Sequence, residues 1–151
     1  MAMFVAGSAR GHATYKFSSG TYTVNINSIA FAPSGIFTIE GDGPERTIIS
    51  VPISLAVVGQ RTMFLLPRGP GTNAVFRDLQ LRGHFLNNSP TFNPSIAGIW
   101  HLGLGELEIA NCKFDQLDTN VKYQEQVEAY IHDSEFSNGR LNAILGGGAD
   151  S

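Results

Sequence analysis

Two stretches of this chain repeat each other at an offset of 22: the segment 98–114 reads GIWHLGLGELEIANCKF, and the segment 120–136 reads NVKYQEQVEAYIHDSEF. A fixed period in the twenties is typical of stacked structural repeats, in which each unit buries its apolar face against a neighbour. The alignment therefore predicts a stack of short strands. Small or apolar residues match in five aligned pairs: Ile99/Val121, Leu107/Ala129, Ile109/Ile131, Cys112/Ser134 and Phe114/Phe136.

The repeat extends in both directions. Residues 75–81 match residues 108–114 at an offset of 33, and residues 142–146 match residues 120–124 at an offset of 22. Each full repeat is predicted to hold three short strands. In the central repeat we expect these at Ile99–Leu102, Leu107–Ala110 and Cys112–Leu117, with a bend at Asn111 and a longer turn at residues 118–120.

The longer offset places an insertion in the polar stretch 82–95. Insertions in stacked repeats form loops on one face, often the binding face, so this stretch is predicted to be a functional loop. Arg82 and His84 are its candidate ligand-binding residues. His84, Phe85 and Phe92 either contact a ligand or fold the loop back onto the stack.

Asp78, Asn111 and Asp133 occupy the same position in successive repeats. Asn and Asp tolerate left-handed backbone, and their side chains can hydrogen-bond along a stack. We therefore interpret the three residues as a structural bend ladder rather than as catalytic groups.

The composition supports a folded, β-rich chain. Of 151 residues, 42% are hydrophobic and 15% charged, while 17 Gly and 7 Pro leave little room for long helices. We predict a ragged segment over residues 1–14 and one domain over residues 15–151. Because the last repeat stops part-way, the C-terminal end of the stack is predicted to be uncapped. Either the chain is a fragment, or other copies cover its ends.

Charge and residue spacing exclude several classes of partner. A net charge of −3 gives no electrostatic footprint for nucleic acid. The longest apolar run, residues 51–58, is too short and interrupted for a membrane span. The four His residues lack metal-ligand spacing, so no metal site is predicted. Cys112 lies in an apolar column and is predicted to be a buried thiol.

Three parts of the sequence resemble the pectin-lyase-like right-handed parallel β-helix superfamily. They are the run 20–24 (GTYTV), the run 34–49 (SGIFTIEGDGPERTII) and the later repeats in which a strand is followed by Asn-x-x-Phe. The resemblance implies an all-β right-handed parallel β-helix of about four to five coils. It also implies a location outside the cell or on a virion or cell surface. No cofactor is predicted from the residues, and only the resemblance admits calcium. Because the superfamily holds lyases, hydrolases, epimerases, tailspikes and adhesins, the fold does not fix an activity.

Alternation along the strands places Trp100, Lys122 and Ile144 in one outward column. A Trp ring can stack on a sugar, and a neighbouring Lys can bind a carboxylate, so Trp100 and Lys122 are candidate ligand-binding residues. The catalytic sets of polygalacturonase-like hydrolases and calcium-dependent pectate lyases are not found. Catalytic residues therefore stay unknown, and enzymatic activity stays open.

The acidic residues offer no hydrolytic pair in this alignment. At the offset of 22, Asp115 falls on Ser137 and Asp118 falls on Arg140, which predicts that no two carboxylates stand in register. The Asp118/Arg140 pair is instead predicted to be a surface ion pair.

These observations favour a carbohydrate-directed domain of a polysaccharide-degrading or tailspike-like polysaccharide-recognising protein. The alternative is a structural module that stacks end to end into an oligomer or filament.

Overall fold

The structure, a computed structural model, describes residues 12–24, 29–30, 35–51, 61–66, 72–84, 96–124, 127–139 and 141–147. Their regular structure is entirely β. The strands are β1 (His12–Lys16), β2 (Gly20–Thr23), β3 (Ile29–Ala30), β4 (Gly35–Glu40), β5 (Thr47–Ser50), β6 (Arg61–Leu66), β7 (Thr72–Arg82), β8 (Ile96–His101), β9 (Gly105–Asp115), β10 (Thr119–Gln124), β11 (Val127–His132), β12 (Glu135–Ser137) and β13 (Leu141–Gly147).

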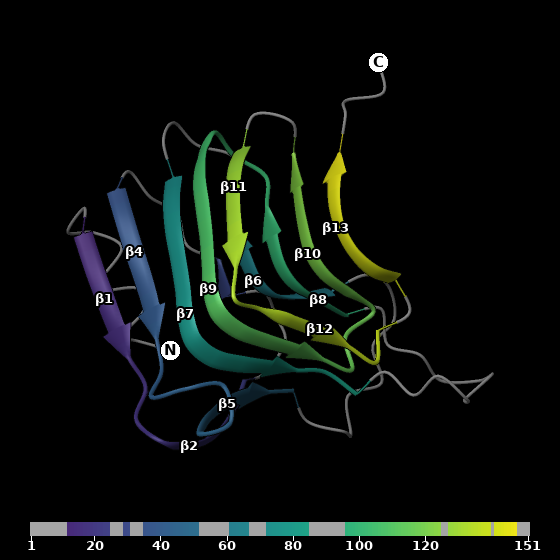
Figure 1. Ribbon diagram of the computed structural model, residues 1–151. Coiled ribbons are helices and arrows are strands. Elements are labelled where there is room, and N and C mark those ends of the chain that lie inside the picture. Colours follow the sequence, from purple (N-terminus) through teal and green to yellow (C-terminus); the bar gives the residue numbers. More distant parts are fainter. Residues whose placement is uncertain are drawn as a thin grey trace.

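The strands form two sheets, and every strand pairing is parallel. In the first sheet β1, β4, β7, β9 and β11 lie side by side, as Figure 1 shows. The long strands β7 and β9 then curve, so that their second halves pair with β5 and β12. The second sheet has the order β13-β10-β8-β6-β3. The prediction of an all-β chain with parallel strands is confirmed.

The predicted register is also confirmed in the central strands. Ile131 pairs with Ile109, and Val121 pairs with Ile99, as the shorter repeat offset predicts. Leu81 pairs with Phe114, as the longer offset predicts. Side chains that the sequence aligned therefore lie directly beside one another on neighbouring strands.

The last strand departs from this register. Thr119 pairs with Leu141 at the expected offset, but a register shift follows, and Lys122 pairs with Leu145. The prediction that Ile144 continues the column of Trp100 and Lys122 is therefore wrong. An extra residue in one strand of a pair shifts every later pairing by one position.

Two expected boundaries also differ. β1 already begins at His12, before the predicted domain start at Tyr15. Thr119 and Asn120, predicted as part of a turn, are the first residues of β10 and are buried. Most of the predicted loop, residues 85–95, lies outside the described residues, as do residues 1–11.

Alternate residues of both sheets point inward and form one core. The largest fully buried side chains include Phe64, Phe76 and Phe114, and Phe114 stacks on Phe136 with ring centroids 4.9 Å apart. Cys112 is buried in the same core, and burial raises the pKa of its thiol to about 12. An inert buried thiol is what such an environment produces.

The bend column has left-handed backbone at each of the predicted positions. The φ angles are 57° at Asp78, 48° at Asn111 and 52° at Asp133. Asn111 Nδ2 donates a hydrogen bond of 2.7 Å to Asp78 Oδ1. Gly41, which directly follows β4, occupies the bend position beside Asp78. A Cβ at Gly41 would lie 2.2 Å from the Asp78 carbonyl oxygen. The close approach of two backbones at this bend requires a glycine.

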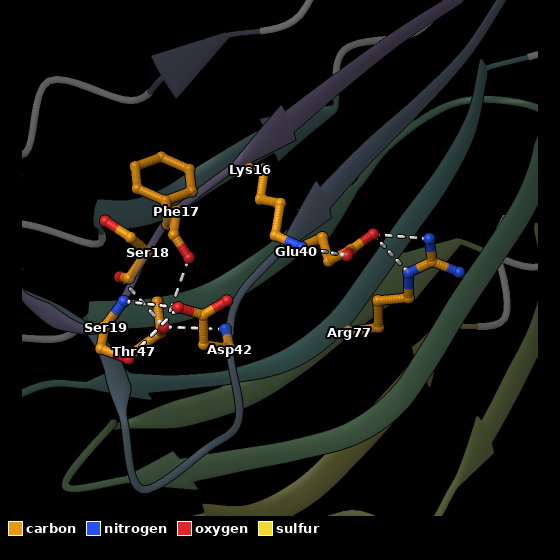
Figure 2. Close-up of polar contacts among 8 residues, drawn as sticks. All are labelled: Lys16, Phe17, Ser18, Ser19, Glu40, Asp42, Thr47 and Arg77. Carbon is orange, nitrogen blue, oxygen red and sulfur yellow. Dashed lines mark hydrogen bonds and ion pairs between the residues drawn. The ribbon is translucent and has the colours of Figure 1, made fainter.

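The bend next to Gly41 is held by small polar side chains (Figure 2). Asp42 Oδ2 accepts hydrogen bonds from the Ser19 N–H at 2.8 Å and from the Ser19 hydroxyl at 3.2 Å. The Asp42 N–H donates to the Thr47 hydroxyl at 2.9 Å, and that hydroxyl donates to the Ser18 carbonyl at 3.2 Å. These contacts tie three neighbouring chain segments together.

Candidate functional site

The outer face of β9 and β11 carries the densest set of exposed functional side chains among the described residues. We call this set the β9/β11 face: Glu106, Glu108, Glu128, Tyr130 and His132. The inward residues between them, such as Leu107 and Ile109, belong to the core. Period-2 alternation therefore sends all five functional side chains to the same side of the sheet.

Two carboxylates of this face stand directly opposite each other. Glu106 and Glu128 are partners in the β9–β11 pairing. The prediction that no carboxylate pair stands in register is therefore wrong. Neighbouring parallel strands lie about 4.8 Å apart, so like charges at opposed positions repel and disfavour the pairing.

Tyr130 stands beside this pair. It is 55% exposed, and its hydroxyl donates a hydrogen bond of 3.0 Å to Glu128 Oε2. This hydrogen bond raises the pKa of the Tyr130 phenol, because ionisation would break it. Glu108 is the partner of Tyr130 in the strand pairing. The exposed ring is thus fixed at its hydroxyl end and bordered by carboxylates.

His132 completes the face. Its Nδ1 lies 2.9 Å from Asp133 Oδ2, and its Nε2 lies 3.8 Å from Glu108 Oε1. The hydrogen bond to Asp133 raises the pKa of the imidazole, which favours the charged form. His132 is thus the one basic side chain of this face, beside three carboxylates and a phenol.

The other half of the same outer face is internally paired (Figure 2). Arg77 Nη2 lies 2.5 Å from Glu40 Oε2, and Lys16 Nζ lies 3.4 Å from Glu40 Oε1. The bond from Arg77 holds the pKa of the Glu40 carboxyl below its ordinary value. The three charges alternate in sign across β1, β4 and β7, so each lies beside an opposite charge and one positive charge remains unmatched.

The predicted pair Trp100 and Lys122 lies together on the second sheet. They are partners on β8 and β10, and the Lys122 ammonium lies 4.5 Å from the centroid of the Trp100 ring. This is a cation–π contact. The ammonium occupies the ring face over which it lies, so that face is not free for a sugar.

Arg82 and His84, the other predicted ligand residues, lie on the far half of the first sheet. Arg82 Nε lies 3.5 Å from Asp115 Oδ2, and Arg82 Nη2 donates to Gln80 Oε1 at 3.2 Å. The His84 ring contacts the Val51 carbonyl oxygen through Nε2. The structure thus gives both residues protein partners and separates them from the Trp100/Lys122 pair.

Gln80 has an unusual environment. It is fully buried, although it lies on the outer side of β7, and its Nε2 has no hydrogen-bond partner among the described residues. Its strand partners are Ile48 and Lys113, and the Lys113 ammonium bonds to Glu45 at 3.1 Å. Because Glu45 lies near the start of β5, we infer that the Lys113 side chain crosses over Gln80 and covers it.

Two acidic residues that the sequence analysis considered, Asp115 and Asp118, lie away from the β9/β11 face. Asp115 accepts a hydrogen bond of 2.8 Å from Asn138 Nδ2 and is nearly buried. Asp118, predicted to form a surface ion pair with Arg140, is 3% exposed, so its side chain does not lie at the surface. Arg140 lies outside the described residues, so the pairing itself stays a prediction.

No group of three His, Cys, Asp or Glu side chains in the described ranges could hold a metal ion. Among the same residues, no helix is long and apolar enough to cross a membrane.

The sequence carried a signal for the β9/β11 face that the prediction missed. Glu106 and Glu128 are separated by the shorter repeat offset, so the alignment already placed one on the other. The outward position of Tyr130 had the same signal, because Tyr130 lies between Ala129 and Ile131, which the alignment placed on Leu107 and Ile109.

Comparison of the chain with protein-family models, curated proteins and solved structures finds no match.

Proposed function

We propose that the chain is a right-handed parallel β-helix of about four to five coils, similar to the pectin-lyase-like superfamily, and that it binds carbohydrate. The parallel strand pairings at the two repeat offsets support the β-helix proposal. The left-handed bends at Asp78, Asn111 and Asp133 support it as well, since they recur once in each repeat. Such a role would place the chain outside the cell or on a virion or cell surface.

The exposed ring of Tyr130 carries the carbohydrate proposal. Carbohydrate rings stack on aromatic side chains, and a ring with a fixed orientation loses little entropy on binding. The hydrogen bond to Glu128 fixes the ring of Tyr130, and 55% of the residue remains exposed. Tyr130 is therefore a better platform than Trp100, over whose ring the Lys122 ammonium lies.

The charges around Tyr130 favour one class of glycan. Carboxylates accept hydrogen bonds from sugar hydroxyls and attract protonated amines, but they repel other carboxylates. Glu106, Glu108 and Glu128 lie around Tyr130, and His132 is the one basic side chain among the five residues of this face. We therefore propose neutral or amino-sugar glycans as ligands, rather than uronates.

Binding fits this face better than hydrolysis does. A glycosidase needs two carboxyl groups, one of which is kept protonated by a shielded environment. Glu106 and Glu128 stand at a suitable strand spacing, but both are exposed. No described residue encloses them, so the face offers a docking surface rather than a closed catalytic site.

The test is binding to an oligosaccharide array with three arms: neutral glucans, chitosan oligomers and oligogalacturonates. Wild-type protein is expected to bind in the first or second arm, and Tyr130→Ala to lose about tenfold in affinity. Ile36→Ala, an exposed apolar residue on the same sheet at β4, is the control and should bind as wild type.

Two results would overturn the proposal. Absence of binding in all three arms would remove the carbohydrate function. A loss of binding with Trp100→Ala, while Tyr130→Ala binds normally, would move the site to the second sheet and reject the β9/β11 face.

A further inference from the structure

A second column of bends lies where the curved strands of the first sheet end. Its members directly follow β7, β9 and β12 and are separated by the two repeat offsets: Gly83, Gln116 and Asn138. The backbone is left-handed at the last two positions, with φ of 55° at Gln116 and 53° at Asn138. At Gly83 a Cβ would collide with the Gln116 carbonyl oxygen, so the first position requires glycine. The later two positions accept glutamine and asparagine.

Asn138 has a close counterpart in the first bend column. Asn111 and Asn138 are both exposed, and both have left-handed backbone. Asn111 Nδ2 donates a hydrogen bond of 2.7 Å to Asp78 Oδ1, and Asn138 Nδ2 donates one of 2.8 Å to Asp115 Oδ1. The two asparagines therefore share their exposure, their backbone conformation and the chemistry of their partner.

The residue that follows each asparagine separates the two. Cys112 follows Asn111, whereas Gly139 follows Asn138 and completes the one Asn-Gly pair of the chain. The side-chain amide of an asparagine can be attacked by the backbone nitrogen of the next residue, and a side chain on that residue hinders the approach. Glycine has no side chain, and its backbone adopts the widest range of conformations. This reaction is therefore favoured at Asn138 over Asn111.

We propose that Asn138 is a site of spontaneous deamidation and that Asn111 resists the same reaction. The backbone nitrogen of Gly139 bonds to Cγ of Asn138, and the bond from Cγ to Nδ2 breaks. The amide nitrogen takes up the backbone proton and leaves as ammonia, and a cyclic succinimide remains. Water then opens the ring at one of its two carbonyls and gives aspartate or isoaspartate. The site is independent of the proposed glycan function, because Asn138 is not part of the β9/β11 face.

Deamidation changes the charge at a nearly buried carboxylate. Asp115 Oδ1 accepts hydrogen bonds from Asn138 Nδ2 and, at 3.3 Å, from the Ser137 hydroxyl. An aspartate at position 138 has no donor for this contact and brings a second negative charge to it. Isoaspartate also adds a backbone atom to the bend, next to the hydrogen bond of 3.2 Å from the Gln116 N–H to the Ser137 carbonyl oxygen. Both products should therefore loosen the end of β12.

Peptide mass spectrometry of the folded full chain tests the proposal. The protein is held in mildly alkaline buffer at physiological temperature, and samples are digested at intervals. The peptide that contains Asn138 is expected to gain the mass difference between an amide and an acid several-fold faster than the peptide that contains Asn111. The matched control is Asn138→Gln, which should fold, because Gln116 has the same left-handed φ at the equivalent bend. Glutamine must close a larger ring, so this variant should lack the mass gain at position 138.

The structural effect of the product is tested with Asn138→Asp. At neutral pH and low salt the Tm of this variant is expected to lie about 2–4 °C below that of wild type. Added salt should narrow the difference, because it screens the repulsion from Asp115. Asn138→Gly keeps the left-handed bend and removes the hydrogen bond without adding charge, so its Tm should fall less.

Two outcomes would overturn the assigned site. Equal rates of mass gain at Asn138 and Asn111 would show that the following residue does not decide the reaction. A folded protein in which Asn138 is unchanged after long incubation would show that the bend blocks the attack. An equal Tm for Asn138→Asp and wild type would reject the effect on β12.

Discussion

The outer face of the first sheet has two halves with the same parallel backbone pairing. One half places opposite charges beside each other, and the other half places like charges beside each other. In the half formed by β1, β4 and β7, Glu40 lies between Lys16 and Arg77, and each charge faces an opposite one. In the half formed by β9 and β11, Glu106 faces Glu128. Only the first arrangement stabilises the strand pairing.

Under the proposed function, this difference separates a structural half of the surface from a binding half. Like charges at opposed positions cost stability, so their presence calls for a reason other than folding. The hydrogen bond from Tyr130 to Glu128 offsets part of that cost and holds the exposed ring in place. The hydrogen bond between His132 Nδ1 and Asp133 Oδ2 holds the imidazole in place. The proposed binding role requires both side chains to be fixed.

The largest expected effect is a loss of stability at Gly41, which lies in the bend column of the first half. Gly41→Ala places a Cβ 2.2 Å from the Asp78 carbonyl oxygen and 2.7 Å from Thr47 Cβ, so we expect a loss of about 3 kcal/mol in the free energy of unfolding. Urea denaturation measures it.

The matched change in the other half is Asn111→Gly. Glycine adopts the left-handed φ of Asn111 easily, and only an exposed hydrogen bond to Asp78 is lost, so less than about 1 kcal/mol is expected. Equal losses in the two variants would contradict the picture of a tight bend at Gly41.

The ion pairs of Glu40 with Lys16 and Arg77 should make the free energy of unfolding fall at acid pH. Glu40→Gln removes both ion pairs and should cost about 1 kcal/mol at neutral pH and low salt, since exposed pairs are screened. The lowered pKa of Glu40 means that its stabilisation is present above its ordinary pKa of 4.5 and is lost as pH falls through the folded value. Denaturation of both proteins between about pH 7 and about pH 3 measures this.

The corresponding variant of the second half is Glu128→Gln, which relieves a repulsion. If it loses stability at neutral pH as Glu40→Gln does, the two halves are not different in the way that the ion pairs indicate.

Charge reversal should act in opposite directions on the two halves. Glu106→Lys replaces a repulsion with Glu128 by an attraction, and we expect a gain of about 0.5 kcal/mol in the free energy of unfolding. Glu40→Lys, flanked by Lys16 and Arg77, should instead destabilise the chain. Thermal unfolding at low salt is the measurement, and addition of salt should shrink both changes. The same sign for both variants would remove the contrast between the halves.

The smallest effect concerns His132. Its raised pKa predicts an NMR titration midpoint above the ordinary 6.5, and Asp133→Asn should lower that midpoint. The sign follows from linkage: the stabilisation is present below the ordinary pKa and is lost as pH rises through the folded value. A midpoint unaffected by Asp133→Asn would show that the hydrogen bond to Asp133 does not hold the imidazole.

The sequence by itself determined the strand register and the inward columns of the central strands. The match of Ile109 with Ile131 and of Leu81 with Phe114 was readable because inward positions repeat with a period that the chain encodes locally. The bend residues were readable for a similar reason, since Asn and Asp are favoured where backbone turns left-handed. The opposed carboxylates of the β9/β11 face were equally encoded at the shorter offset, although the prediction about carboxylate pairs rested on other acidic residues.

Only the tertiary structure decided how the outward side chains are used. A single register shift after Thr119 moved Leu145, not Ile144, beside Lys122. Long side chains also reach beyond their own column, as when Lys113 bonds to Glu45. Such contacts depend on side-chain rotamers and on neighbours distant in sequence, and the repeat constrains neither. An inward side chain must fit one closely packed core, whereas an outward side chain can adopt many conformations.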